Sequence, residues 1–548
     1  MRKIHFSAWL LVVLSAVLQI LIFPLPGLYI LSWVAITPLI VALLRARPAG
    51  ELETSGSPRL EAATPWQAFL LSYACGILWY AGTCYWIFDT MRQYGGLNTA
   101  AALLALFLFC CYLGLYHGAF GLLLSLLVRR GRDYRIALVT APFLWVAVEL
   151  ARTRITGFPW NLLGISQVDN VALCRLAAWT GVYGISFEIV LVNVALAAAF
   201  VVPRGKRGAL LVAGLAAAAV LQAGKLIEAP AFTADHAALL VQPNLPVAAN
   251  WTTEYFQQTL SDLTRLTVKG AASIPPWSMR WQAAKINLIV WPESPAPFYA
   301  NDPLFRHAIG EMALQTQTSV VVGSIGTNPA MGAAGNSSPP SNPRAAAKVF
   351  NSASLITPRG EFAARYDKVH LVPFGEYLPF PSLFSFAGGL TKEVGEFEHG
   401  SSRDPLTAEG VPLGVFICYE SIFPDEVRQF ANHGAQVLVN ISNDGWYGDS
   451  GAYAQHLNQT RMRAIENNRW LLSATNTGVT ASIDPLGRLA ARMPRQVRAP
   501  LIAPYALTSV TTFYTRHGDW FAFACAIISL GALLFSFASS TFRKERKG

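Results

Sequence analysis

Three side chains with complementary chemistry follow hydrophobic segments in the second half of the chain. Glu293 comes directly after the segment 286–291, Cys418 ends the apolar run that begins at Leu413, and Lys368 lies in a turn-rich segment. A carboxylate can take the thiol proton, the thiolate can attack a carbonyl carbon, and an ammonium group can stabilise the oxyanion. The set indicates acyl transfer. Taken singly, Glu293 could instead cap a helix and Lys368 could be a solvated loop lysine.

Cys418 stands where a strand-like segment meets polar residues. Residues 423–426 have a proline and two acids in the positions typical of a helix start. A helix N-terminus near the thiol would favour the thiolate, whose unperturbed pKa is about 8.5. The alternative is a buried structural cysteine. Cys418 is the only cysteine between residues 226 and 515, so it has no disulfide partner there. The histidines are scattered, and we expect neither a metal site nor a cofactor.

The composition is that of a membrane protein. The chain has 548 residues, of which 53% are hydrophobic and 14% are charged. Its net charge of +10 comes from short basic clusters beside apolar segments. Such clusters are typical of membrane topology signals, so we do not expect nucleic-acid binding.

Apolar segments long enough to cross a bilayer occur in two parts of the sequence. They predict about eight transmembrane helices near 7–24, 27–44, 66–87, 99–128, 136–151, 177–202, 208–224 and 518–540. With this number the larger basic clusters all fall on one side, which the positive-inside rule makes the cytoplasm. We therefore expect three parts: a seven-helix domain at 1–225, an exported domain at 226–515, and a last helix with a basic cytoplasmic tail at 516–548.

The exported part alternates between short buried strands and helices, which predicts α/β layers. Strands are expected at 237–242, 286–291, 319–324, 349–356, 413–418, 436–441, 471–474 and 479–483, and helices near 252–269, 302–316, 424–433 and 452–467. Residues 328–347 are rich in Pro, Gly, Ser, Asn and Ala and are expected to be a disordered surface insertion.

Three short blocks carry a resemblance to a known family. Trp-Pro-Glu at 291–293, Tyr-Asp-Lys at 366–368 and Cys-Tyr-Glu at 418–420 resemble, in order and wide spacing, the catalytic blocks of the carbon–nitrogen hydrolase (nitrilase) superfamily. Together with the apolar segments and the block 157–167, the chain resembles the membrane branch of that superfamily, the apolipoprotein N-acyltransferases of Gram-negative bacteria. The resemblance implies an α-β-β-α sandwich and the triad Glu293, Lys368 and Cys418. It also implies supporting roles for Glu376, Tyr419, Glu420 and Trp251.

The same resemblance implies a reaction in two stages. Cys418 would take an acyl chain from a phospholipid as a thioester, and the α-amine of a diacylglyceryl-cysteine lipoprotein would then accept it. Glu293 would act as the base in both stages, Lys368 would stabilise both oxyanions, and Glu376 would support Lys368 or shuttle protons. The enzyme would lie in the inner membrane with its catalytic domain in the periplasm, needing no cofactor. A monomer is the default expectation, since one active site per chain suffices.

Access for a lipid is expected beside the catalytic segment. The stretch 377–386 is unusually apolar, and we expect a mobile arm carrying Phe384 and Phe386 to dip into the bilayer. The alternative is that it packs on the soluble core. Trp446 and Tyr447 would line the same opening or would be ordinary core aromatics.

Two other functions are less well supported. A membrane-tethered amidase that uses water would share the triad but would need neither the block 157–167 nor the apolar stretch. A transporter or receptor with an outer sensory domain would commonly show paired broken helices, which the sequence does not indicate, and would not need Glu293, Lys368 and Cys418 together.

Overall fold

The structure is a computed structural model of the whole chain. It describes residues 3–52, 58–128, 134–202, 204–228, 231–247, 249–273, 285–294, 296–328, 348–378 and 397–545. The chain divides into two compact units. The first comprises residues 1–88, 99–229 and 517–548, and the second comprises residues 89–98 and 230–516. Residues 89–98 thus pack with the second unit, although the sequence analysis places them in the N-terminal domain.

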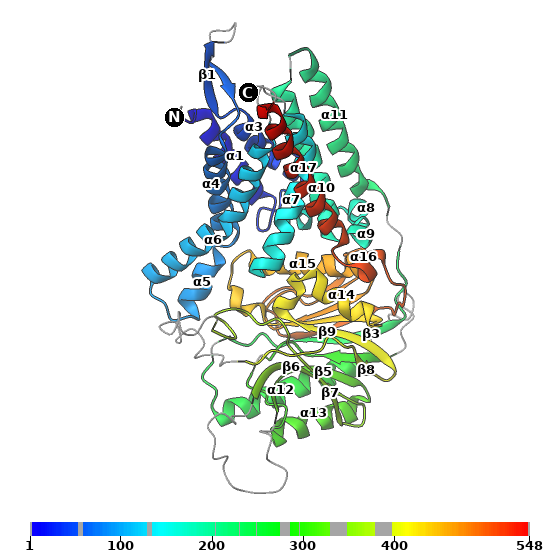
Figure 1. Cartoon of the computed structure of the whole chain (residues 1–548). Coiled ribbons are helices and arrows are strands. Elements are labelled where there is room, and N and C mark those ends of the chain that lie inside the picture. The colour runs from blue at the N-terminus through cyan, green and yellow to red at the C-terminus, as the bar shows by residue number, and fades with distance from the viewer. Residues whose placement is uncertain are drawn as a thin grey trace. The chain divides into compact units, whose positions relative to one another are not determined.

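The first unit is built from helices (Figure 1). Among the described residues, five helices are long and apolar enough to cross a membrane, and a sixth span results if α4 and α5 form one bent pair. The first two expected segments are shorter than predicted, because Phe6–Leu21 ends before Pro24 and Tyr29–Leu44 is divided into short pieces. The main helices are α1 (Phe6–Leu21), α3 (Thr37–Leu44), α4 (Pro65–Thr83), α6 (Thr99–Leu126), α7 (Arg135–Ala151), α10 (Val182–Val201), α11 (Arg204–Ala223) and α17 (Trp520–Glu545).

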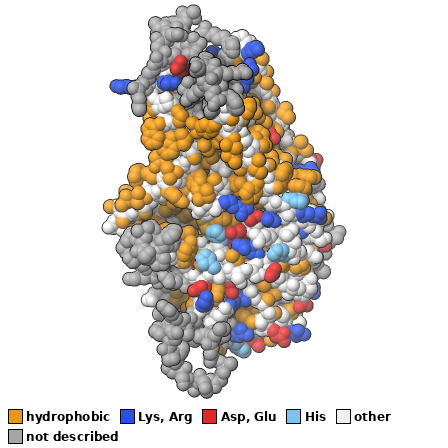
Figure 2. Space-filling model, in the orientation of Figure 1, with side chains coloured by type: hydrophobic (Ala, Val, Ile, Leu, Met, Phe, Trp, Pro, Cys, Tyr) orange, Lys and Arg blue, Asp and Glu red, His pale blue; other side chains and the backbone are white. Residues whose placement is uncertain are grey.

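Large apolar side chains face outward from these helices. Figure 2 shows them gathered as a nearly continuous apolar surface over the first unit. Leu104, Phe107 and Leu108 on α6 and Ile527 and Leu534 on α17 are each more than half exposed. An apolar exterior of this extent is stable in lipid rather than in water. The first unit is therefore a membrane domain.

The first sheet of the second unit has the strand order β14-β3-β4-β5-β6-β7. Its strands are β3 (His236–Gln242), β4 (Ile286–Val290), β5 (Ser319–Asn328), β6 (Lys348–Ile356), β7 (Phe362–Asp367) and β14 (Ala499–Tyr505). Side chains alternate between its faces, as strand geometry requires. Leu239, Val241 and Ile289 pack against α12 (Thr253–Ala272) and α13 (Pro303–Thr316), whereas Leu240 and Val290 face the other way.

The second sheet has the order β13-β12-β11-β10-β9-β8. Its strands are β8 (Leu406–Ala408), β9 (Val411–Ile417), β10 (Val437–Ser442), β11 (Leu471–Thr475), β12 (Ala481–Ile483) and β13 (Leu489–Arg492). Its inward side chains join those of the first sheet in one buried core, and α14 (Pro424–Asn432) and α15 (Ala452–Asn467) supply that core from the other face. Helix, sheet, sheet and helix are thus stacked as layers (Figure 1), which confirms the predicted sandwich.

Four strands of the sandwich were not expected from the sequence, and all four lie at sheet edges. They are β7 and β14 in the first sheet and β8 and β13 in the second. Edge strands are buried on fewer sides, so they need no continuous apolar run. β14 even carries Pro500 and Pro504, which an edge strand tolerates.

Candidate active site

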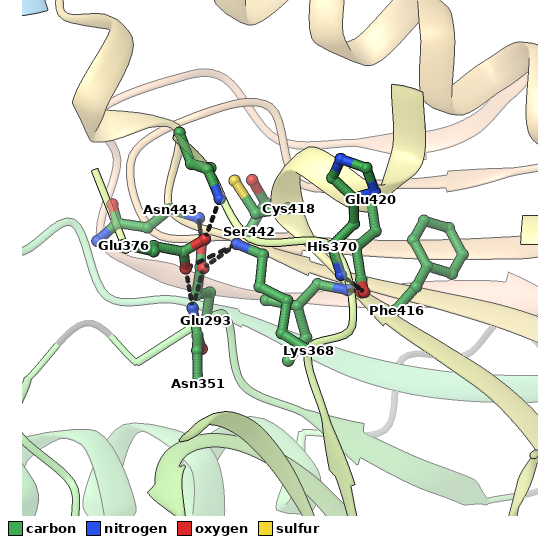
Figure 3. A network of polar contacts seen from close by, with 12 residues as sticks. Glu293, Asn351, Lys368, His370, Glu376, Phe416, Cys418, Glu420, Ser442 and Asn443 are labelled. Atoms are coloured by element: carbon green, nitrogen blue, oxygen red, sulfur yellow. Dashed lines mark hydrogen bonds and ion pairs between the residues drawn. The ribbon is translucent and has the colours of Figure 1, made fainter. Parts of the chain in front are cut away.

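The carboxyl ends of strands from both sheets converge on one buried polar cluster (Figure 3). Glu293 follows β4, Lys368 follows β7, and Cys418 follows β9. Residues 75 and 50 positions apart in the chain therefore meet because each stands directly beyond a strand of the sandwich. The structure brings together the three residues that the sequence analysis selected, and none of them is more than 7% exposed.

Lys368 lies between two carboxylates. Its Nζ donates to Glu376 Oε1 at 2.9 Å and to Glu293 Oε1 at 3.2 Å. Burial alone would lower the pKa of Lys368, but the Glu293 and Glu376 carboxylates more than reverse this and hold it above its usual value. Lys368 is therefore a fixed cation at neutral pH, and at 1% exposed it is not the solvated loop lysine of the alternative interpretation.

Asn351 in β6 holds the two glutamates in place, and the sequence analysis missed it. Its Nδ2 donates to Glu376 Oε1 at 2.6 Å and to Glu293 Oε1 at 2.7 Å. Its backbone carbonyl oxygen accepts the backbone N–H of Lys368 at 2.8 Å. The second oxygen of Glu293 accepts the backbone N–H of Asn443, at the end of β10, at 2.9 Å. An asparagine within an apolar strand is the signal that could have revealed this site.

Cys418 has an unusual backbone conformation and a thiol whose pKa is raised. Its φ of +50° lies in the left-handed region, which costs a non-glycine residue about 1–2 kcal/mol. Burial, followed by the neighbouring Glu293 carboxylate, raises the pKa of the Cys418 thiol well above its usual value. The sequence predicts that a helix N-terminus favours the thiolate, but these two effects oppose it. The thiol needs a base, and Glu293 is the neighbouring carboxylate.

Glu420 ties the segment after β7 to the segment after β9. One of its carboxylate oxygens accepts the N–H groups of Val369 at 2.8 Å and His370 at 3.0 Å, and the other accepts that of Ile417 at 2.7 Å. Its first oxygen also accepts the Tyr366 hydroxyl at 2.7 Å. These bonds join the neighbours of Lys368 to the neighbour of Cys418. Glu420 is therefore placed to position both residues rather than to react.

The remaining predicted residues lie in different surroundings. Trp251 stacks on Tyr255 with ring centroids 4.8 Å apart, against the helix-covered core. Tyr419 is buried and packs edge-on against Phe423. Tyr447 is buried, with its ring 5.7 Å from that of His456.

Trp446 is half-buried next to the segment 89–98. Its ring lies edge-on to that of Tyr94 at 5.0 Å, and its carbonyl oxygen accepts the Thr90 hydroxyl at 2.9 Å. Phe384 and Phe386, together with most of the expected arm and insertion, lie outside the described residues.

Gly323 in β5 leaves room for the backbone that carries Glu293. A Cβ at this position would lie 2.2 Å from the Pro292 carbonyl oxygen and 2.5 Å from the Ser294 nitrogen. Backbone atoms cannot yield as a side-chain tip can, so Gly323→Ala should displace Glu293 from Lys368. We expect activity to fall about tenfold or more and the protein to lose about 1–3 kcal/mol of stability.

Activity assays and thermal unfolding of purified Gly323→Ala would check this expectation. Gly208→Ala is the matched control, since a Cβ there meets no atom within 4 Å. A Gly323→Ala variant as active and stable as Gly208→Ala would contradict the close approach.

Known proteins match both parts of the chain. Residues 15–195 match the family model of the apolipoprotein N-acyltransferase N-terminal domain, and residues 236–513 match that of carbon-nitrogen hydrolase. An apolipoprotein N-acyltransferase of Geobacter metallireducens is 35% identical over 94% of this chain and 93% of its own. One from Methylococcus capsulatus is 33% identical over 84% of this chain and 85% of its own. A solved amidase from Nesterenkonia sp. aligns with a TM-score of 0.36 and 17% identity, covering 53% of this chain and 98% of its own.

The sandwich fold and the match of residues 236–513 define the class as a carbon–nitrogen hydrolase-type enzyme. Within that class, the match of residues 15–195 in the membrane unit points to the branch that carries this N-terminal domain. The chain belongs to the apolipoprotein N-acyltransferase family.

Proposed function

We propose that this enzyme moves an acyl chain from a phospholipid, through a thioester on Cys418, to the terminal amine of a diacylglyceryl-cysteine lipoprotein. The observation that carries the proposal is the placement of a buried thiol beside the Lys368 ammonium, which two glutamates hold. A base, a cation and a nucleophile in one dry site are what an acyl transfer of this kind needs.

In the first stage Glu293 takes the proton from the Cys418 thiol, and the thiolate attacks the carbonyl carbon of the phospholipid ester. Lys368 stabilises the negative oxygen of the tetrahedral intermediate. The ester C–O bond then breaks, and the departing glycerol oxygen receives the proton from Glu293. The products are a lysophospholipid and the acyl thioester of Cys418.

In the second stage the lipoprotein amine attacks the thioester carbonyl, and Lys368 again faces the oxyanion. Glu293 accepts the proton that the amine nitrogen loses, the C–S bond breaks, and the proton returns to the sulfur of Cys418. A thioester is already activated for acyl transfer, so the amide forms without a separate energy source. Glu376 and Asn351 hold Lys368 and Glu293 in position during both stages.

The cellular setting is part of the proposal. The basic clusters and apolar helices support a bacterial inner-membrane enzyme with cytoplasmic termini and a periplasmic domain at 226–515. A monomer suffices, because every proposed catalytic residue comes from one chain. Phe384 and Phe386 would admit the acyl chains, with Trp446 and Tyr447 at the same opening. The half-buried position of Trp446 fits this role better than the buried position of Tyr447.

The intact mass of the purified protein after incubation with phospholipid alone tests the proposal. We expect a gain of one fatty acyl group that hydroxylamine removes, that Cys418→Ala lacks, and that an added diacylated lipopeptide clears as the amide appears. Free fatty acid without a persistent adduct would instead indicate a hydrolase that uses water. The absence of both an adduct and turnover would refute the enzymatic proposal.

A further inference from the structure

A buried histidine on the helix α15 contacts the backbone of Cys418, the proposed nucleophile. His456 on α15 is 2% exposed. Its Nε2 lies 3.1 Å from the carbonyl oxygen of Cys418 and 2.8 Å from the Ser421 hydroxyl. Its Nδ1 lies 3.2 Å from Asp444 Oδ1. Both ring nitrogens are thus engaged, one by the nucleophile's own residue.

Hydrogen bonds to the Cys418 carbonyl and to Asp444 at the same time need a proton on both ring nitrogens, with the Ser421 hydroxyl then accepting from Nε2. A backbone carbonyl and a carboxylate only accept hydrogen bonds, whereas a neutral imidazole carries a single N–H. Burial alone would lower the pKa of His456, but the Asp444 carboxylate more than reverses this and raises it, with a smaller contribution from Glu293. The Tyr447 phenol, whose ring lies 5.7 Å from that of His456, also has a raised pKa and is neutral.

Asp444 is itself held rigidly. The Ser442 hydroxyl donates to its Oδ1 at 2.6 Å. On the opposite side the chain passes so close that a Cβ on Gly478 would lie 2.2 Å from Asp444 Oδ2. A continuous series of contacts therefore runs from the end of β10 through Asp444 and His456 to the Cys418 carbonyl.

His456 contacts Cys418 at a point where the backbone conformation needs support from its surroundings. A non-glycine residue at φ +50° persists only where its surroundings fix it. We infer that His456, as an imidazolium held by Asp444, is a positioning residue that fixes the backbone of Cys418 and so aims its sulfur at the substrate carbonyl. The inference rests on the proposed role of Cys418 as the nucleophile.

Two isosteric variants separate this role from a purely structural one. In His456→Gln the amide nitrogen replaces Nε2 and can still donate to the Cys418 carbonyl. In His456→Asn the amide nitrogen replaces Nδ1, so the bond to Asp444 survives and the bond to Cys418 is lost. We expect alkylation of Cys418 by iodoacetamide to slow about tenfold or more in His456→Asn and less than threefold in His456→Gln.

The pH dependence gives a second readout. Because the folded-state pKa of His456 is raised, the doubly protonated ring persists below that pKa and is lost as the pH rises through it. The alkylation rate of the unmodified enzyme relative to His456→Gln should therefore fall toward alkaline pH, since glutamine does not titrate. A side chain that merely fills space would leave this ratio independent of pH.

The matched control is His433→Asn, since His433 Nδ1 also lies 3.2 Å from a carboxylate, Asp404, but on the exposed surface. Equal slowing in His456→Asn and His456→Gln, with a pH-independent ratio, would overturn the inference. Alkylation needs no lipid, so the test is independent of the proposed function. If no thioester forms on phospholipid while alkylation follows the expected order, the proposed function fails and the positioning role stands.

Discussion

Glu293→Gln is expected to slow thioester formation about a thousandfold while leaving the protein folded. The thiol of Cys418 has a raised pKa, so almost none of it ionises at neutral pH without a base. Glutamine fills the same space, and its oxygen can still accept from Asn351 and Lys368, which lie 2.7 Å and 3.2 Å from Glu293 Oε1. One bond is lost, because the amide nitrogen cannot accept the Asn443 N–H that Glu293 Oε2 accepts at 2.9 Å. Glutamine cannot take a proton from sulfur. The lost hydrogen bond is worth about 1 kcal/mol, so most of the expected thousandfold loss comes from the missing base.

Mass spectrometry of samples quenched over time after mixing with phospholipid would measure this rate. The residual rate of Glu293→Gln should rise about tenfold per pH unit, because thiolate then forms only by ionisation into solvent and its fraction grows until the raised pKa of Cys418 is reached. Glu311→Gln, at an exposed position of α13, is the control. A Glu293→Gln enzyme that acylates at the rate of Glu311→Gln would remove Glu293 from the role of base.

The sequence predicted strands well where both faces of the strand are buried. The interior strands β4, β5, β9 and β10 are continuous apolar runs, and each was placed within a few residues. Residues that follow such strands lie where the carboxyl ends of the strands meet. For this reason Glu293 and Cys418 could be selected from the order of residues alone. The edge strands lack that pattern. Without β7 the sequence left Lys368 in a turn-rich segment, although it stands directly beyond a strand in the same way.

Contacts that depend on three dimensions could not be predicted. Asn351 interrupts an apolar strand, which marks a site but not its partners, and His456 lies within a helix whose neighbours in sequence give no sign of one. Their roles arise because β6 passes beneath Glu293 and because α15 packs beside the start of the η8 turn, Cys418–Ile422. The pKa shift of the Cys418 thiol could not be predicted from the sequence either. Sequence suggested a nearby helix N-terminus, but only the structure shows full burial beside a carboxylate, and that combination reverses the direction of the pKa shift.

Lys368→Met should abolish measurable turnover and also destabilise the protein, and the two effects have different causes. Without the ammonium, each oxyanion loses the charge that faces it, which costs about 10²–10³ in rate at each stage. Two buried carboxylates, Glu293 and Glu376, also lose the cation between them. Removing one partner from buried ion pairs typically costs about 3–5 kcal/mol. The matched control is Lys348→Met, because Lys348 pairs with Glu398 at 3.5 Å but is 62% exposed.

A double variant tells the two effects apart. Lys368→Met/Glu376→Gln carries one buried charge fewer than Lys368→Met, so it should recover part of the lost thermal stability, on the order of several degrees. It should recover no activity, because no cation faces the oxyanion. Thermal unfolding in detergent and acylation by intact mass measure the two quantities on the same samples. If activity returned together with stability, Lys368 would be a structural cation for the glutamates. If stability returned alone, the ammonium would act on the transition state itself.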